Sequence, residues 1–246
     1  MLVTTQLLRR CGELSLRAMS SAEAERVQEY AINGSQAKYL SELCIAVDRN
    51  DRPIRSVSKR DCHSVQTMVL HRAFSVFLFT SSGSLVLQKR SASKVTFPSV
   101  WTNSCCSHPL WNEYEMPVNG SILGVCRAAQ RKLRHELGIH KLPIENMNVM
   151  GRYIYKSMSD TGWGEHELDY VIVVPDFNAA ELRPNSEEVE ETAIVDREQL
   201  KAMVAGGAKF SPWFTLLMNG LYLNTWWDNL DRLAHFKDLD TIRVLN

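Results

Sequence analysis

Short apolar runs separated by turn-forming residues dominate the first half of the chain and predict β-strands. Residues 43–47, LCIAV, form one such run and meet the turn sequence DRNDRP at residues 48–53. Residues 73–80 and 85–89 are rich in β-branched and aromatic side chains, and the four residues between them read SSGS. The pattern therefore predicts an opening strand and then a β-hairpin.

The middle of the chain contains one strongly amphipathic segment, which predicts a helix. In residues 123–137, apolar side chains recur every three or four positions. Gly138 follows directly, where glycine commonly ends a helix. Three further strands and two terminal helices are predicted at residues 148–155, 167–174, 189–195, 197–205 and 211–227.

The order of these elements indicates an α+β or mixed α/β fold rather than a regular βαβ array. Neither GxGxxG nor GxxxxGK[ST] occurs, so a glycine-rich phosphate loop is not predicted. With 246 residues and 45% hydrophobic content, the chain can bury one good core. We therefore expect a single domain of mixed β-sheets flanked by helices over residues 21–246.

Overall charge argues against a nucleic acid or a membrane surface as the main partner, because 28 basic residues balance 28 acidic ones. No apolar run approaches the roughly 20 residues that span a bilayer. The cysteines show no CxxC pairing, which favours reduced thiols. The sequence favours neither a monomer nor a dimer, and any affinity for phosphate must come from local clusters.

Residues 1–20 have the composition of a mitochondrial presequence. They contain three arginines and a single acid, Glu13, with leucines at helical spacing. The alternative is an ordinary terminal segment of a cytoplasmic protein, and Glu13 counts in its favour.

A thiol and an imidazole lie close together in residues 101–109, WTNSCCSHP. If this segment is extended, Cys106 and His108 point to the same side. A thiol becomes a useful proton carrier when nearby charges, a metal or backbone amides shift its pKa. Taken alone, the pair is more simply explained as a buried cysteine and a hydrogen-bonded histidine.

Further histidines and carboxylates make a metal site a reasonable hypothesis. Two histidines precede the predicted hairpin, and EHE at residues 165–167 opens a later strand with both carboxylates on one face. Each of these residues alone is compatible with a surface or core position, so only their joint occurrence is informative. The candidate ligands for Mn²⁺, Zn²⁺ or Mg²⁺ are His63, His71, His108, Glu165 and Glu167.

Basic and aromatic residues complete the candidate chemistry. Tyr155 can hydrogen-bond a carboxylate, and Trp213 can offer its ring to a cation, although core packing is the common role of tryptophan. Three basic groups can bind phosphate oxygens or simply be solvated: Lys59 with Arg60, Lys89 with Arg90 and Lys94, and Arg131 with Lys132.

Taken together, six segments resemble the type I isopentenyl-diphosphate isomerases of the Nudix-like superfamily. The resemblance runs from residue 40 to residue 233. The segments are LHRAFSVFLF (70–79), FPSVWTNSCCSHPL (97–110), RAAQRKLRHELG (127–138), GWGEHELDY (162–170), SPWF (211–214) and WWDNL (226–230). The resemblance implies a Nudix-like fold and the interconversion of isopentenyl and dimethylallyl diphosphate in isoprenoid biosynthesis.

The resemblance also implies a role for each candidate residue. Cys106 would be the catalytic thiol, with Cys105 as its non-catalytic neighbour, and Glu167 the opposing carboxylate. Tyr155 would support that carboxylate, and Trp213 would cover a tertiary carbocation. The implied metal shell is His63, His71, His108, Glu165 and Glu167, with Glu136 holding a second Mg²⁺ beside the diphosphate. The implied diphosphate contacts are Lys59, Arg90, Lys94, Ser107, Arg131 and Lys132.

Departures from the family pattern keep two alternatives open. Ser99 and Lys132 stand where relatives often have glycine and arginine, and the interval between the two early histidines also varies. Leu123, Lys132 and His135 occupy positions where Nudix hydrolases carry glutamates. A Nudix hydrolase of nucleoside diphosphate derivatives is one alternative, which the missing acids disfavour. A non-catalytic metal-binding scaffold is the other.

Overall fold

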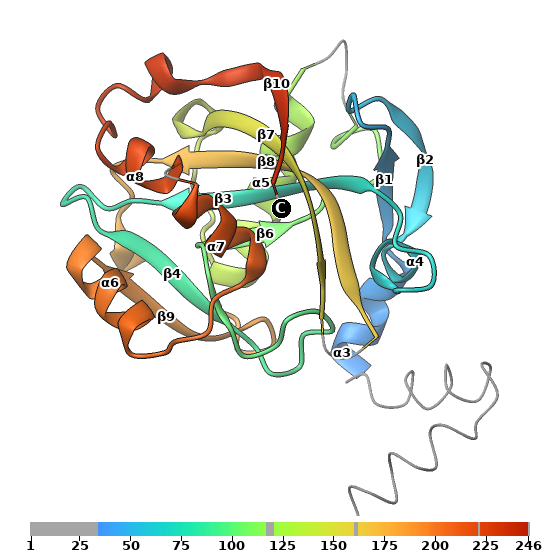
Figure 1. Cartoon of the computed structure of the whole chain (residues 1–246), viewed down its shortest axis with the longest axis horizontal. Helices are drawn as coiled ribbons and strands as arrows, with labels where there is room; N and C mark the ends of the chain where they lie inside the picture. The colour runs from blue at the N-terminus through green and yellow to red at the C-terminus, as the bar shows by residue number, and fades with distance from the viewer. Residues whose placement is uncertain (1–33, 117–120, 160–161, 221, 246) are drawn as a thin grey trace, which may run out of the picture.

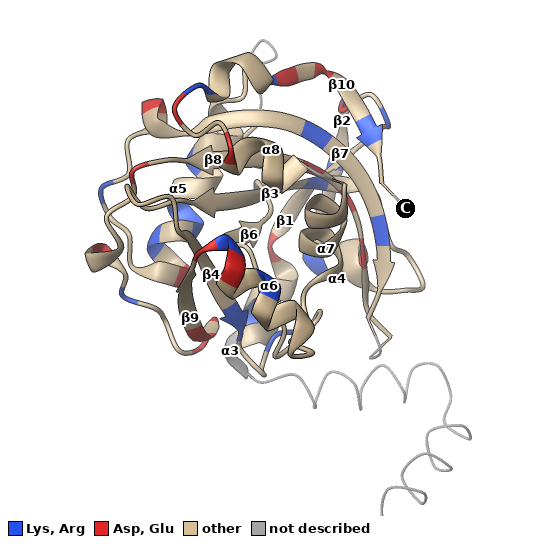
Figure 2. Cartoon of the chain, turned by 60° about the vertical axis from the view of Figure 1, so that its left-hand side comes forward, with Lys and Arg blue, Asp and Glu red and all other residues tan. Residues whose placement is uncertain are grey.

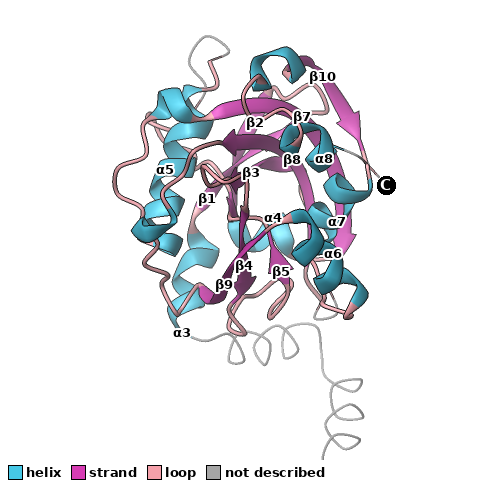
Figure 3. Ribbon diagram, turned by 90° about the vertical axis from the view of Figure 1, so that its left-hand side faces the viewer, coloured by secondary structure: helices cyan, strands magenta, loops and turns pink. Residues whose placement is uncertain are grey.

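A computed structural model describes residues 34–116, 121–159, 162–220 and 222–245 of the chain (Figure 1). The proposed leader, residues 1–20, lies outside them. Strands form two sheets, and Figure 3 shows helices on both flanks of the strands, which confirms the predicted α+β class. No helix in this part of the chain is both long and apolar enough to cross a membrane.

The larger sheet has seven strands in the order β10-β7-β8-β3-β1-β2, with β6 also paired to β3. Its strands β3 and β8 are parallel, as are β7 and the C-terminal β10, so the sheet is mixed. Its bounds are β1 (Leu43–Val47), β2 (Pro53–Ser58), β3 (His71–Leu78), β6 (Cys105–Ser107), β7 (Asn148–Met158), β8 (Gly164–Val174) and β10 (Asp238–Val244). The smaller sheet contains β5 (Trp101–Thr102), β4 (Leu85–Arg90) and β9 (Val189–Val195) in that order.

The predicted hairpin is wrong in its pairing, although β3 and β4 form close to where it was expected. A tight turn joins them, with Gly83 in the left-handed region at φ 76°, but apart from an isolated bridge between Phe79 and Leu85 they belong to different sheets. The reason is that both edges of β3 are occupied, by β8 on one side and by β1 and β6 on the other. The chain therefore has to enter the second sheet.

Most of the helix predictions are confirmed. Helix α5 spans Leu123–Leu137 and ends at Gly138, which adopts φ 67°, and α6 spans Arg197–Ala205. The single helix predicted over 211–227 is instead α7 (Pro212–Asn219) and α8 (Tyr222–Trp227). Glycine at 220 ends α7, in keeping with its cost of about 1 kcal/mol in a helix interior.

Several short elements were not predicted. Helix α4 (Lys59–His63) is too short to show periodicity, but the hydroxyl of Ser58 caps it by accepting a hydrogen bond from the amide of Asp61. A first turn of helix, α3 (Gly34–Ala37), continues into η1 (Lys38–Ser41). The remaining 3₁₀ turns are η2 (Ile144–Asn146), η3 (Ala179–Glu181) and η4 (Leu233–Phe236).

Apolar side chains cover both faces of the large sheet. Phe74 and Val76 pack on the face that α5 covers with Leu133, whereas Phe77 packs on the other face with Phe214 of α7. Strands buried on both faces appear as continuous apolar runs, which is the pattern seen in the sequence. Polar side chains enter this interior at the amino ends of β3 and β8, and they define the candidate site.

Figure 2 shows acidic and basic positions interspersed over β4, β9 and α6. All five cysteines in the described part of the chain carry free thiols.

Candidate active site

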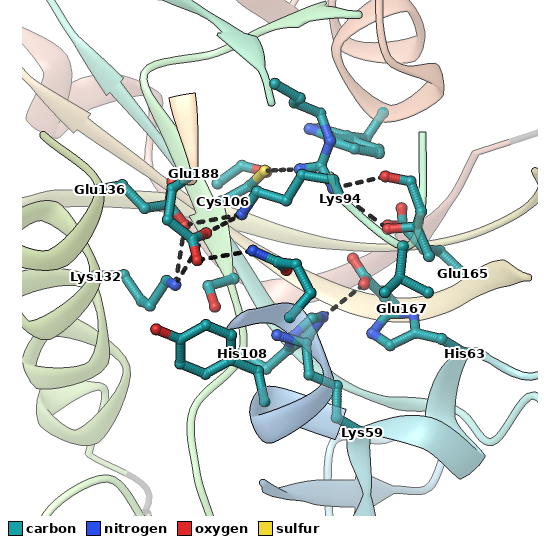
Figure 4. A pocket seen from close by; sticks show the side chains of 18 of the residues that line it. Lys59, His63, Lys94, Cys106, His108, Lys132, Glu136, Glu165, Glu167 and Glu188 are labelled. Carbon is teal, nitrogen blue, oxygen red and sulfur yellow. Dashed lines mark hydrogen bonds and ion pairs between the residues drawn. The ribbon is translucent and has the colours of Figure 1, made fainter. Parts of the chain in front are cut away.

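A cavity collects most of the candidate side chains from segments that are far apart in the sequence (Figure 4). Its walls come from α3 and η1, α4, the loop after β4, β6, α5, β7 and β8. The polar and aromatic residues that line it include Lys59, His63, Arg90, Lys94, Cys106, Ser107, His108, Lys132, Glu136, Tyr155, Glu165, Glu167, Glu188 and Trp213.

Strand register explains why several of these side chains meet. Tyr155 of β7 lies opposite Glu167 of β8, and Glu167 lies opposite His71 of β3. Residues directly opposite each other in neighbouring strands point to the same face, so the three side chains form one row. Cys106 lies opposite Ser75, four residues along β3 from His71 and on the same face.

His63, His71, His108 and Glu167 form a buried group in which one potential ligand atom from each lies within 4.8 Å of the others. Nδ1 of His63 lies 3.0 Å from the carbonyl of Gly164, and Nδ1 of His71 lies 2.8 Å from that of Val69. Nε2 of both rings is buried without a hydrogen-bond partner among the described residues. Such backbone contacts orient metal-binding histidines in proteins, so the group fits a metal ion.

The pKa shifts of three of the four side chains also fit a metal. Burial lowers the pKa of His63 well below its usual value and that of His108 to about 3. Burial alone would raise the pKa of Glu167, but the hydrogen bond of His108 at 2.8 Å and the nearby imidazole of His71 at 3.6 Å outweigh it and hold that pKa well below normal. Neutral imidazoles and an ionised carboxylate are the forms that bind metals. His71 differs, because the nearby carboxylate of Glu167 outweighs burial and raises its pKa, so metal binding would release its proton.

Glu165 adjoins this group through Tyr155. The Tyr155 hydroxyl oxygen lies 2.7 Å from a carboxylate oxygen of Glu165 and 2.8 Å from one of Glu167. Burial, followed by the charge of Glu167, raises the pKa of Glu165 to about 7. The hydroxyl has one proton and cannot donate to both carboxylates at once, so these groups share protons within one network.

Only one thiol of the vicinal pair faces the cavity. Nη1 of Arg90 donates to Sγ of Cys106 at 3.5 Å, and the guanidinium also lies over the ring of Trp213, 5.4 Å from its centroid. Burial raises the pKa of Cys106 to about 12 in spite of Arg90, so the group is a neutral thiol at pH 7. Cys105 points into the core against α5, as the alternation along β6 requires.

Two ammonium groups and two carboxylates form a charge-balanced group beside the thiol. Nζ of Lys132 lies 3.1 Å from Oε1 of Glu136, and Nζ of Lys94 binds Glu188 and lies 3.8 Å from Glu136. All four side chains are nearly or fully buried. The two positive and two negative charges of this group balance one another.

Three further candidate residues, Arg131, Lys59 and Trp213, differ in how they lie relative to the cavity. Within the described residues, Arg131 does not line the cavity; its guanidinium binds Glu115 at 2.6 Å and the carbonyl of His108 at 3.0 Å. Lys59 lines the cavity and lies 3.8 Å from Glu42. The indole N–H of Trp213 donates to Asn103 at 2.9 Å, which fixes its ring.

The lining residues that sequence reasoning missed include Gln36, Tyr39, Thr96 and Glu188. Thr96 donates to Glu165 at 2.9 Å, and Tyr39 lies 3.0 Å from Nε2 of His135. None of the four belongs to a motif. The only signal for Glu188 was an acid directly before the predicted strand 189–195.

Comparisons with known proteins agree with this geometry. Residues 69–214 match the NUDIX domain family. The chain is 42% identical to isopentenyl-diphosphate Delta-isomerase I, chloroplastic, of Arabidopsis thaliana, over 95% of the chain and 84% of the relative. It is 44% identical to isopentenyl-diphosphate Delta-isomerase 1 of Bos taurus, over 84% of the chain and 93% of the relative. A solved structure from Deinococcus radiodurans shares the fold, with a TM-score of 0.50, 20% identity and coverage of 74% of this chain and 98% of that one.

Proposed function

The chain belongs to the isopentenyl-diphosphate Delta-isomerase family and contains its NUDIX domain, and from this premise we infer how it interconverts isopentenyl and dimethylallyl diphosphate for isoprenoid biosynthesis. The observation that carries the proposal is the cavity, which combines a thiol, a carboxylate, a fixed aromatic ring and several cations. Conversion of isopentenyl diphosphate without release of phosphate is the test.

Cys106 and Glu167 are the two proton carriers in this proposal. Strands β6 and β8 pair with opposite edges of β3, so the thiol and the carboxylate enter the cavity from two sides. Protonation of the terminal alkene carbon gives a tertiary carbocation, and loss of a C2 proton gives the product. One proton enters and one leaves, on opposite faces, which is what two separate acid/base groups supply.

Trp213 stabilises the cation in this scheme. Its side chain is 2% exposed, and the hydrogen bond to Asn103 fixes the plane of the ring. A fixed indole face attracts a cation, most strongly where water is excluded. Exclusion of water also protects a tertiary cation from capture as an alcohol. Tyr155 holds Glu167 in position by its hydrogen bond.

The metal shell in this proposal consists of His63, His71, His108, Glu165 and Glu167. The nitrogen ligands favour Mn²⁺ or Zn²⁺, and Mg²⁺ is the alternative. A bound ion would supply positive charge that lowers the proton affinity of its carboxylate ligands. Glu136 would hold a second Mg²⁺ together with the diphosphate.

The diphosphate would bind to the cations that line the same cavity. Lys59, Lys94 and Lys132 supply ammonium groups there, and Ser107 supplies a hydroxyl. Arg90 donates hydrogen bonds to the carbonyls of Thr96 and Phe97, which fix its guanidinium. The fixed guanidinium can position the thiol of Cys106 as well as add positive charge. Arg131 would have to release Glu115 before it could reach the substrate.

Hydrolysis is the competing reaction, and the site disfavours it. Nudix hydrolases place glutamates where this chain has Leu123 and His135. Leu123 has no acid or base, and the imidazole of His135 is engaged by Tyr39 and Lys132. The acid/base groups that do line the cavity support proton transfer instead.

We also propose that residues 1–20 direct import into mitochondria, because their three arginines, single acid and apolar stripe are typical of presequences. Curated relatives include chloroplastic isomerases, so targeting to an organelle has a parallel. A fluorescent protein fused behind residues 1–20 should colocalise with a mitochondrial marker. Diffuse cytosolic fluorescence would reject the leader and support cytoplasmic location, and plastid fluorescence would correct the organelle.

A further inference from the structure

Glu188 is a buried carboxylate of the cavity that the proposed chemistry leaves without a role. Its side chain is 2% exposed. One oxygen, Oε2, binds the ammonium of Lys94 and lies 3.8 Å from that of Lys132. The other, Oε1, accepts a hydrogen bond from Gln36 at 3.2 Å. Because both oxygens have partners, the orientation of the carboxylate is fixed.

The backbone of Glu188 reinforces the same arrangement. Its carbonyl accepts a hydrogen bond from the amide of Ser91 at 3.0 Å, and the carbonyl of Ser91 accepts one from the amide of Lys94 at 3.1 Å. Glu188 therefore holds Lys94 at both ends, through the loop that carries it and through its ammonium group (Figure 4).

Removal of the Glu188 charge would redirect the ammonium group of Lys94. Lys132 and Lys94 already lie 3.1 Å and 3.8 Å from Oε1 of Glu136. Lys132 already forms an ion pair with Glu136, so without Glu188 the ammonium group of Lys94 would be drawn to that carboxylate as well. Glu136 would then be less available for Mg²⁺, and the lysines less available for the diphosphate.

We propose that Glu188 is a positioning residue for diphosphate binding, which holds Lys94 through its ammonium group and its loop and limits the ion pairing of Lys94 with Glu136. This inference rests on the proposed function to the extent that it assigns the diphosphate to these lysines. The side chain of Glu188 contacts Gln36, Lys94 and Lys132 rather than Cys106 or Glu167, so its expected effect is on binding rather than on the chemical step.

The test is Glu188→Gln, which keeps the shape of the side chain and removes its charge. The KM for isopentenyl diphosphate should rise about tenfold or more, while kcat changes less than about threefold, because the lost contacts are charge-assisted. Glu188→Asp retains the charge and should give an intermediate KM. Glu190→Gln is the matched control, since Glu190 lies two residues further on in an exposed ion pair with Lys89, and it should leave KM unchanged.

Calorimetric titration with inorganic diphosphate and Mg²⁺ separates this inference from the isomerase assignment, because it needs no turnover. About tenfold weaker binding to Glu188→Gln supports the inference even if the wild-type protein fails to isomerise. Unchanged or tighter binding of diphosphate to Glu188→Gln overturns the inference. A lower melting temperature of this variant with an unaltered KM also overturns it, because the carboxylate would then have a purely structural role. If Glu188→Gln does not fold, Glu188→Asp takes its place in both measurements, and an unchanged KM in that variant would overturn the inference equally.

Discussion

Replacement of Cys106 by alanine should lower kcat by about 10²–10⁴-fold or more, the contribution expected of a positioned acid/base group. The cavity would keep its cations and its metal-binding residues, so substrate binding should change much less than turnover. The measurement is steady-state conversion of isopentenyl diphosphate, with binding followed separately. The physical reason is that Cys106 is the thiol that faces the cavity beside Arg90.

Cys105→Ala is the matched control for this thiol, since it removes a neighbouring sulfur that points into the core. A small apolar cavity and the loss of a 3.5 Å contact to Glu136 should cost some stability but leave much of the turnover. Comparable activity in the two variants would remove the assignment of Cys106.

Removal of the metal should abolish turnover and lower the melting temperature together. Three imidazoles and Glu167 converge with unpartnered nitrogens among the described residues, so binding to the folded state alone is expected. At a metal concentration 100-fold above Kd, such binding adds about 2.7 kcal/mol to the free energy of unfolding. Elemental analysis of pure active protein should find at least one ion per chain, lost on chelation along with activity.

The identity of the native ion would follow from which of Mg²⁺, Mn²⁺ and Zn²⁺ restores the chelated protein. His71→Ala should reproduce the loss, whereas His140→Ala, at an exposed position outside the group, should retain both metal and activity. Active protein without stoichiometric metal would contradict the proposed shell.

The elements that the sequence predicted well are those whose pattern is local. The amphipathic period of α5 and the glycine at 138 depend on neighbours within a few residues, and both were predicted correctly. The pairing of β3 was not, because it depends on which strands occupy its two edges, and β8 lies almost 100 residues away. The turn residues between β3 and β4 predict a hairpin whether or not an edge of β3 is free to pair with β4.

The candidate site shows the same division. The spacing of Cys106 and His108 and the alternation at 165–167 were visible in the sequence, and the family motifs supplied their roles. The convergence of Tyr155, Glu167 and His71 was not visible, because it follows from the register of three strands. Glu188 was missed because it acts through ion pairs with residues more than 50 positions away, for which no spacing rule exists.

The most direct test of the central claim is incubation of isopentenyl diphosphate with the protein and Mg²⁺ in D₂O, because fold alone does not separate an isomerase from a hydrolase. Proton NMR should show a mixture with dimethylallyl diphosphate, with deuterium at the carbons that exchange protons and only minor alcohol product. A phosphate assay on the same sample should find no stoichiometric release. Release of phosphate from nucleotide substrates, with no deuterium entering isopentenyl diphosphate, would contradict the isomerase and favour the hydrolase.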